Sequence, residues 1–130
     1  MKVAVLSNVF KENSDSVAVE EDLTSVGLTV EKALKKKGLD VEFYDVNEKT
    51  FEELRKSDVD IAYNVCERFN GNSFFEPHVA SMLELLNIPY TGSGPLALAT
   101  CMNKVRVKEI MKLNGIPTPN WQVFNSRYQK

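Results

Sequence analysis

The stretch DVDIAYNVCERFNGNSFFEPHVASMLELLNIPY, residues 58–90, contains a complete strand–helix–strand unit. Residues 58–65, DVDIAYNV, are predicted to form a strand. Ser73 and Glu76 have the spacing of a capping box, which predicts a helix there, and residues 88–90 predict another short strand. Two strands joined through a helix run parallel in one sheet. This unit therefore indicates an α/β fold.

The same alternation of strands and helices comes before this unit. The sequence predicts a buried first strand at residues 2–9, a helix at about 24–37, a second strand at 40–46, and a short helix at 50–56 capped by Thr50. Strands that alternate with helices imply a parallel sheet whose two faces are both covered. We therefore predict a three-layer α/β fold, Rossmann-like, with helices on both faces of a parallel sheet.

Two further helices are expected after this unit, at residues 95–101 and 104–114, before Gly115 ends the run. The turn that precedes them, GSGPLA at residues 92–97, matches the G-x-G-x-x-[GA] pattern of dinucleotide-binding proteins. A true dinucleotide fingerprint follows the first strand and has a carboxylate about 20 residues later. Neither condition is met here, so a tight turn with Pro95 at the start of a helix is the favoured interpretation.

The composition is that of one globular domain. The chain has 130 residues, 43% of them hydrophobic and 26% charged, and its formal net charge is −2. This charge does not favour binding to nucleic acid or to anionic lipid. No apolar run approaches a membrane span, and no signal-peptide core is found near the first residue, so we expect a cytoplasmic protein. Cys66, Cys101 and a single histidine do not predict a metal site.

Lys104 is the first candidate functional residue. Asn103 is the predicted N-cap of the last helix, which places Lys104 in its first turn. The positive end of the helix dipole lies there, so a cation at this position destabilises the helix by about 0.3–1 kcal/mol. A lysine beside free backbone N–H groups suits a phosphate. Alternatively, Lys104 begins a solvated stripe with Lys108 and Lys112, and these residues alone leave both interpretations open.

A second group of candidates lies near the expected carboxyl ends of the strands. Glu20 and Glu21 belong to an acidic segment, predicted as a loop, after the first strand, and Glu67 and Asn70 follow the third. Open α/β sheets bind ligands at this edge, where a carboxylate could hold a substrate ammonium group. Charged loops are often simply solvated, so both interpretations stay open. We take these four residues as candidate substrate-binding residues.

Three motifs carry a resemblance to a known family: LELLNIPYTGSG at residues 83–94, MNK at 102–104 and GIPTP at 115–119. Together they resemble the segment that ends the N-terminal domain of D-alanine–D-alanine ligases and their relatives in the ATP-grasp superfamily. The resemblance implies that residues 1–119 form an N-terminal pre-ATP-grasp domain. Residues 120–130 would then begin the linker, or the first strand, of an ATP-grasp domain that the chain lacks.

The resemblance also implies an activity. In this family ATP phosphorylates the carboxylate of one amino acid, and the amine of a second substrate attacks the acyl phosphate. The motif lysine that approaches the ATP phosphates corresponds to Lys104, and the glutamate that binds the first substrate's ammonium group corresponds to Glu20 or Glu21. ATP and Mg²⁺ would act in the full-length enzyme. The chain alone would bind no cofactor tightly, would be inactive, and would supply part of the substrate crevice.

Two departures from the family pattern leave the joined substrates open. The typical ligase has Gly-Gly-x-Ser-x-Glu after its first strand and His-Gly after its third, whereas this chain has no glycine pair at residues 8–21 and has Val-Cys-Glu at 65–67. The expected partners are an amino-acid or carboxylate substrate and the missing ATP-grasp domains, with a homodimer as a further option. Nucleic acid and membranes are not expected partners.

Two other classes of function remain as alternatives. One is a free-standing small-molecule binding or regulatory module of flavodoxin-like shape, and the other is a dinucleotide enzyme that uses the GSGPLA turn. A phosphoacceptor receiver domain is disfavoured, because Ser7-Asn8 and Asn64-Val65 stand where such a domain needs acidic residues.

Overall fold

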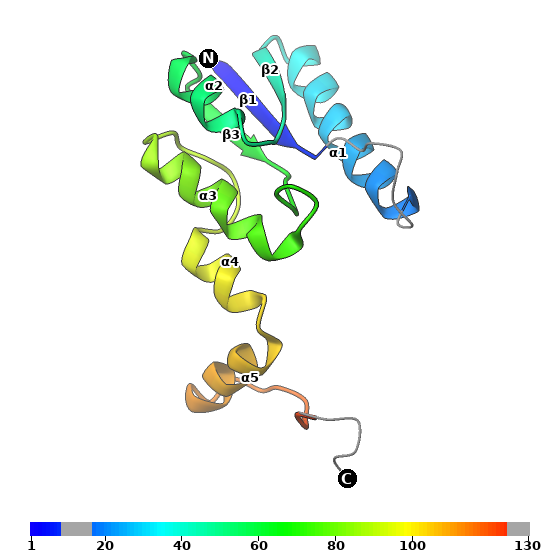
Figure 1. The fold of residues 1–130 in the computed structure, drawn as a ribbon, viewed down its shortest axis with the longest axis vertical. Helices are drawn as coiled ribbons and strands as arrows, with labels where there is room; N and C mark the ends of the chain where they lie inside the picture. The colour runs from blue at the N-terminus through cyan, green and yellow to red at the C-terminus, as the bar shows by residue number, and fades with distance from the viewer. Residues whose placement is uncertain (9–16, 125–130) are drawn as a thin grey trace.

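The centre of the fold is a three-stranded parallel sheet (Figure 1). The computed structural model describes residues 1–8 and 17–124. The strands lie in the order β2 (Asp40–Asp45), β1 (Lys2–Ser7) and β3 (Ile61–Asn64), so β1 is central. The predicted α/β class is confirmed.

The central strand β1 is apolar because it is enclosed on both faces. Its residues from Val3 to Ser7 are all buried. Val3 lies opposite Val41 on β2 and Ile61 on β3, so hydrogen bonds flank the strand on both sides. A strand that is covered on both faces has an unbroken hydrophobic run instead of an alternating one. The strand ends at Ser7, so Asn8 follows it.

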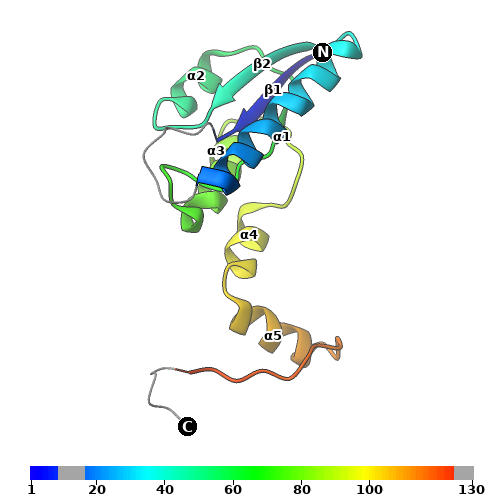
Figure 2. The same cartoon turned by 90° about the vertical axis from the view of Figure 1, so that its right-hand side faces the viewer.

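Helices cover both faces of the sheet (Figures 1 and 2). On one face, α1 packs against β1 and β2. On the other, α2 and α3 contribute Leu54, Val79 and Leu83 to a core that includes Ala4 and Leu6 of β1. The helical elements are α1 (Val17–Lys36), α2 (Thr50–Lys56), the 3₁₀ turn η1 (Ser73–Phe75), α3 (Glu76–Leu85), α4 (Pro95–Cys101) and α5 (Lys104–Leu113). None of the helices in the described residues is long and apolar enough to cross a membrane.

Two predicted helix caps are wrong. At α2 the N-cap position is Lys49, which makes no side-chain capping hydrogen bond, and Thr50 is already helical. The Asn47 Oδ1 accepts from the Lys49 N–H at 2.9 Å in the turn before the helix. At η1 the cap is Asn72, whose Oδ1 accepts from the Phe74 N–H at 2.9 Å. The predicted pair of Ser73 and Glu76 therefore forms no capping box.

Two predicted boundaries also differ from the structure. Helix α1 begins at Val17 instead of near residue 24, so residues 17–22, which were expected in the acidic loop, are helical. The fourth strand, expected at residues 88–90, is reduced to a single bridge between Ala62 and Tyr90.

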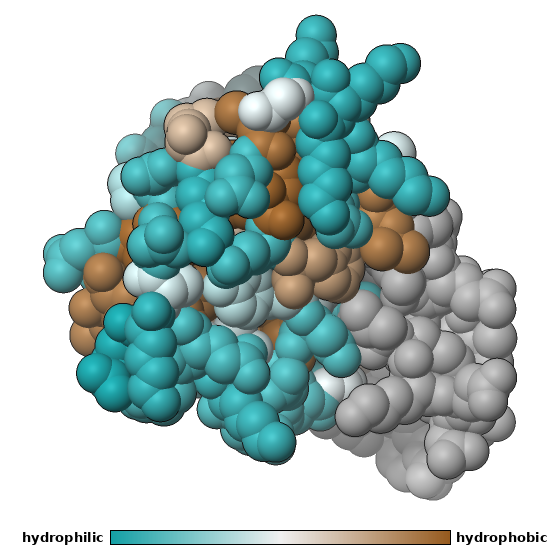
Figure 3. All heavy atoms as spheres, turned by 90° about the horizontal axis from the view of Figure 1, so that it is seen from above, coloured by the Kyte–Doolittle hydropathy of each residue, from teal (hydrophilic) through white to brown (hydrophobic). Residues whose placement is uncertain are grey.

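Lys2 ties the three strands together at the amino-terminal edge of the sheet. Its ammonium group pairs with Asp58 and, at 2.8 Å, with Glu42, while its backbone N–H donates to Asp60 Oδ2 at 2.7 Å. The hydrogen bonds to Asp58 and then to Glu42 raise the pKa of Lys2, and the same contacts lower the pKa values of the two carboxyl groups. The molecular face seen from above this end is mainly hydrophilic (Figure 3).

Helices α4 and α5 project from the sheet as an arm (Figures 1 and 2). Helix α4 contacts α3, and α5 follows α4. Both helices lie wholly within the described residues, and neither has a buried residue. Gly115, with a φ of +67°, ends α5 as predicted, because this left-handed conformation strains residues that carry a Cβ.

The exit segment, residues 116–124, turns back along α5 (Figure 2). The Lys108 ammonium group donates to Thr118 Oγ1 at 3.0 Å and to the Pro119 carbonyl at 3.1 Å, and it lies 5.6 Å from the centre of the Trp121 ring. The solvated stripe of lysines is therefore confirmed only in part: Lys108 is half-buried against the exit segment, whereas Lys112 is exposed and lies 5.8 Å from the centre of the same ring. Both lysines therefore attach the exit segment to α5.

Candidate functional site

The carboxyl-terminal edge of the sheet is organised by Asn8, the residue after β1. Its Oδ1 accepts from the backbone N–H groups of Glu67 at 3.1 Å and Arg68 at 3.2 Å. Its Nδ2 donates to the Arg68 carbonyl at 3.0 Å. The Asn8 amide thus continues the pairing of β1 with β3 beyond the last backbone bond, in which Val65 donates to Leu6. Sequence reasoning did not assign this role to Asn8, because the contact spans nearly 60 residues.

Glu67 and Asn70 both lie in the loop that Asn8 holds, as expected. The Glu67 side chain is exposed. Burial, and then the nearby Glu67 carboxylate, raise the pKa of Glu76 at the start of α3. The charge of the exposed Glu67 carboxylate therefore disfavours ionisation of the partly buried Glu76 carboxyl group.

Asn70 has a structural role that its assignment as a substrate-binding candidate did not include. Asn70 and Gly71 have φ values of 49° and 73° and form a two-residue turn, across which Phe69 and Asn72 exchange backbone hydrogen bonds. Asparagine followed by glycine favours this left-handed turn. The Asn70 Nδ2 also donates to Glu48 Oε1 at 2.9 Å, which joins the turn to the segment after β2. Its amide therefore already has a protein partner.

Glu20 and Glu21 are on a helix instead of in the predicted loop, because α1 starts at Val17. Their side chains lie outside the described residues, as do the preceding residues 9–16. Their backbone places them in the first half of the helix that follows β1.

Lys104 occupies the first turn of α5, as predicted. Asn103 is the N-cap, and its side-chain oxygen accepts from the Arg106 N–H at 3.1 Å. Lys104 is exposed, and no acidic side chain among the described residues pairs with it. Helix α5, which begins at Lys104, lies away from the sheet (Figure 1), so the structure does not bring Lys104 into one site with Glu67 and Asn70.

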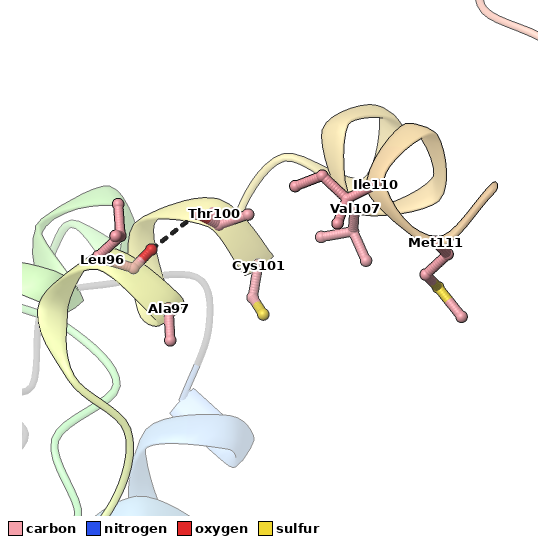
Figure 4. Close-up of a pocket in the computed structure, with 7 residues that line it drawn as sticks. All are labelled: Leu96, Ala97, Thr100, Cys101, Val107, Ile110 and Met111. Atoms are coloured by element: carbon pink, nitrogen blue, oxygen red, sulfur yellow. Dashed lines mark hydrogen bonds between the residues drawn. The ribbon is translucent and has the colours of Figure 1, made fainter. Parts of the chain in front are cut away.

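A groove between α4 and α5 was not predicted. It has a volume of about 510 Å³ and a nearly wholly apolar lining (Figure 4). The lining consists of Leu96, Ala97, Thr100, Cys101, Val107, Ile110 and Met111. The helical periodicity of Val107, Ile110 and Met111 was the available signal, because these residues share one face of α5. That signal does not identify what the face contacts.

The two cysteines have different environments. Cys101 is exposed at the groove, whereas Cys66 is 5% exposed in the core beside β3. Burial is the main cause that raises the pKa of the Cys66 thiol, so this group remains protonated and is a poor nucleophile. Within the described residues, no cluster of three His, Cys, Asp or Glu side chains could hold a metal ion.

Comparison with known proteins gives a consistent set of relatives. No family model matches the chain. The D-alanine–D-alanine ligase of Paracidovorax citrulli is 36% identical over 126 residues, which cover 96% of this chain and 35% of the relative. That of Neisseria gonorrhoeae is 38% identical over 123 residues, 95% of this chain and 38% of the relative. The chain thus spans little more than a third of the length of these relatives.

Solved structures give the same result. The D-alanine–D-alanine ligase from Bacillus anthracis has a TM-score of 0.71 and 26% identity, over 94% of this chain and 38% of the other. A structure of the Bacillus anthracis enzyme complexed with ATP has a TM-score of 0.71 and 27% identity, over 94% of this chain and 37% of the other. The similarity therefore extends over nearly all of this chain in sequence and in structure.

Proposed function

The chain belongs to the D-alanine–D-alanine ligase-like family, and we propose that it is the N-terminal part of an ATP-dependent carboxylate–amine ligase. The observation that carries this proposal is similarity along 96% of the chain to a relative of which the chain spans 35%. In the proposed reaction, a substrate carboxylate attacks the γ-phosphate of ATP, and ADP leaves. The amine of a second substrate then attacks the acyl phosphate, and inorganic phosphate leaves.

We assign Lys104 to the phosphates of ATP. It combines a side-chain cation with the N-terminal end of a ten-residue helix, where backbone N–H groups also favour an anion. Its exposure, and the lack of an acidic partner among the described residues, leave the ammonium group available for this contact. ATP and Mg²⁺ would act in the complete enzyme, and we place the Mg²⁺ ligands in the part of the ligase that this chain does not span.

The substrate crevice is assigned to the carboxyl-terminal edge of the sheet. Glu67 supplies an exposed carboxylate there, on a loop whose backbone Asn8 holds. Glu20 and Glu21 follow β1 on α1 and are the other candidates for binding a substrate ammonium group. Asn70 would contribute by shaping the loop, since its amide is bonded to Glu48.

An ADP-release assay tests this function. The assay compares the 130-residue chain with a chimera, in which this chain is followed by the part of the Paracidovorax citrulli ligase beyond the matched region. We expect no ADP release from the chain alone. We expect release by the chimera with D-alanine or another amino acid as substrate. Lys104→Ala should impair the use of ATP by the chimera, and Lys112→Ala, the same change at the other end of α5, should impair it less.

Two results would contradict the proposal. A folded chimera that releases no ADP with any pair of amino acids would exclude the ligase assignment. Tight and selective amino-acid binding by the 130-residue chain alone, measured by calorimetry, would instead indicate a free-standing binding module.

A further inference from the structure

The dipeptide Asn-Gly occurs twice in the chain, at residues 70–71 and 114–115. An asparagine followed by glycine is prone to deamidation, in which the backbone nitrogen of the glycine attacks the amide carbon of the asparagine side chain. Glycine favours this attack because it has no side chain to shield its nitrogen and because its backbone rotates easily. The attack also requires the folded backbone to bring that nitrogen to the amide carbon, so two identical dipeptides can differ in reactivity.

At residues 70–71 the backbone lies one peptide rotation away from the geometry of attack. Asn70 and Gly71 have φ values of 49° and 73°, and the paired bonds between Phe69 and Asn72 close a two-residue turn of type I′. Rotation of the peptide between Asn70 and Gly71 gives type II′, in which Asn70 keeps a positive φ and takes a ψ of about −120°. At this ψ the Gly71 nitrogen is eclipsed with the Asn70 Cβ and so faces the side-chain amide.

Little in the structure opposes this rotation. Both residues are exposed, and no hydrogen bond from the Gly71 N–H is found among the described residues. The two bonds that close the turn lie outside the rotating peptide, and type I′ and type II′ turns share them. The side-chain amide must leave one partner, since Asn70 Nδ2 donates to Glu48 Oε1 at 2.9 Å, and Glu48 is itself exposed.

The second Asn-Gly dipeptide is held by the end of α5. Asn114 has a φ of −96° and a ψ of 12°, far from the geometry of attack. The Gly115 N–H donates to the Lys112 carbonyl at 3.2 Å, and Asn114 Nδ2 donates to the Ile110 carbonyl at 2.8 Å. Because the attacking nitrogen and the attacked amide are both bonded to the helix, reaction there requires the last turn of α5 to unwind.

We propose that Asn70 is a site of spontaneous deamidation, and that Asn114 is protected from it. The Gly71 nitrogen forms a bond to Asn70 Cγ, the bond from Cγ to Nδ2 breaks, and Nδ2 leaves as ammonia with the proton of the Gly71 N–H. Water then opens the cyclic imide. Cleavage between the nitrogen and Cγ gives aspartate, and cleavage between the nitrogen and the backbone carbonyl carbon gives isoaspartate. The reaction needs only water, so it is independent of the proposed function.

Either product replaces a hydrogen-bond donor with a carboxylate. The new carboxylate cannot donate to Glu48 Oε1, and it places a second negative charge beside that of Glu48. The turn then loses its contact with the segment after β2. The loop that contains this turn also carries Glu67, so deamidation loosens the loop on which the proposed substrate crevice depends.

Peptide mass spectrometry compares the two sites within the same molecule. The 130-residue chain is incubated at physiological temperature and pH and digested with an acid-active protease, and aspartate and isoaspartate are measured at both positions. In the folded chain we expect Asn70 to convert faster than Asn114 by about tenfold or more, because reaction at Asn114 must first break two hydrogen bonds. In the chain unfolded by guanidinium chloride, the two sites should convert at similar rates, because the dipeptide is the same.

Substitutions at Asn70 test the effect on the loop. Asn70→Asp introduces the charge of the product and should speed hydrogen exchange of the Asn72 amide, which donates to the Phe69 carbonyl at 3.0 Å. Asn70→Gly is the matched control, because it removes the same amide, adds no charge and keeps a residue that favours this turn. The effect of Asn70→Asp should shrink when Glu48→Gln is added or the ionic strength is raised, whereas that of Asn70→Gly should not.

Three outcomes would overturn the proposal. The first is conversion of Asn114 in the folded chain at the same rate as Asn70, or faster. The second is aspartate at Asn70 without isoaspartate, because opening of the cyclic imide gives both products. The third is equal hydrogen exchange in the Asn70→Asp and Asn70→Gly proteins, which would show that the new charge does not loosen the loop.

Discussion

Replacing Gly27 with alanine should destabilise the protein, although alanine usually favours a helix interior. A Cβ at Gly27 would lie 2.4 Å from Ser7 Oγ, 2.6 Å from Ser7 Cβ and 3.1 Å from Phe43 Cε2. Ser7 is fully buried on β1, so its side chain cannot move into solvent. Overpacking of this kind costs up to about 3 kcal/mol, and the helix gains about 1 kcal/mol from alanine, so the net loss should reach up to ~2 kcal/mol.

Urea unfolding followed by far-UV circular dichroism measures this loss, with the free energy of unfolding extrapolated to water. Thr29→Ala is the matched control, because Thr29 lies on the same helix and is exposed. The Thr29→Ala variant gains the higher helix propensity of alanine without a clash. Its free energy of unfolding should therefore rise by roughly a few tenths of a kcal/mol.

A double-mutant cycle with Ser7→Gly isolates the clash from the other contacts of Ser7. Gly27→Ala should cost less in the Ser7→Gly background, by about 1 kcal/mol or more. The contacts of Ser7 itself cancel in this comparison. A Gly27→Ala protein as stable as the original, or an absent coupling energy, would refute the inference that α1 packs this closely on β1.

Three further predictions concern side chains that join distant segments. Asn8→Ala should lower the free energy of unfolding by about 1–2 kcal/mol and speed hydrogen exchange of the Arg68 amide, whereas Asn8→Asp, which keeps the acceptor, should retain more protection. Lys108→Met should free Trp121, the single tryptophan, and lower its fluorescence anisotropy; an unchanged anisotropy would contradict the exit-segment contact. The loss caused by Lys2→Met should shrink as the pH falls below ~4, because its carboxylate partners have lowered pKa values and their stabilisation disappears on protonation; an equal loss at neutral and acidic pH would exclude this pairing.

The sequence predicted the strands and the order of the elements well, and it predicted local details less well. A continuous apolar run identified β1, because a central parallel strand must be buried on both faces. The caps at α2 and η1 are predicted at Thr50 and Ser73, but the N-cap of η1 is Asn72, and α2 begins after Lys49 without a side-chain cap. Propensity alone does not rank two good capping residues that lie so close together.

The short strand around Tyr90 was overestimated for a reason specific to its residues. Pro89 lacks a backbone N–H, so it contributes only its carbonyl, which accepts from Ala62 at 2.8 Å. Beyond Tyr90 the pairing passes to a side chain, since Asn64 donates its N–H to Thr91 Oγ1 at 3.1 Å. A pattern of apolar residues does not predict this exchange of a backbone acceptor for a hydroxyl.

At the candidate site, too, features set by neighbouring residues were predictable, and contacts between separate segments were not. The position of Lys104 was predictable, because Asn103 and the helix periodicity both lie within a few residues of it. The contacts of Asn8 and Lys108 were not predictable, because each side chain bonds to a segment outside its own helix or strand. A solvated stripe that includes Lys108 describes α5 alone, without the exit segment that packs on this lysine.

Lys104 and the α4–α5 groove are features of the same helix. Helix α5 has ten residues, none of them buried, and isolated helices this short are only marginally stable. The Asn103 cap, the contact with α4 and the Lys108 contacts with the exit segment support this helix. The placement of Lys104 and of the first-turn N–H groups, on which the proposed phosphate contact depends, therefore depends in turn on these contacts.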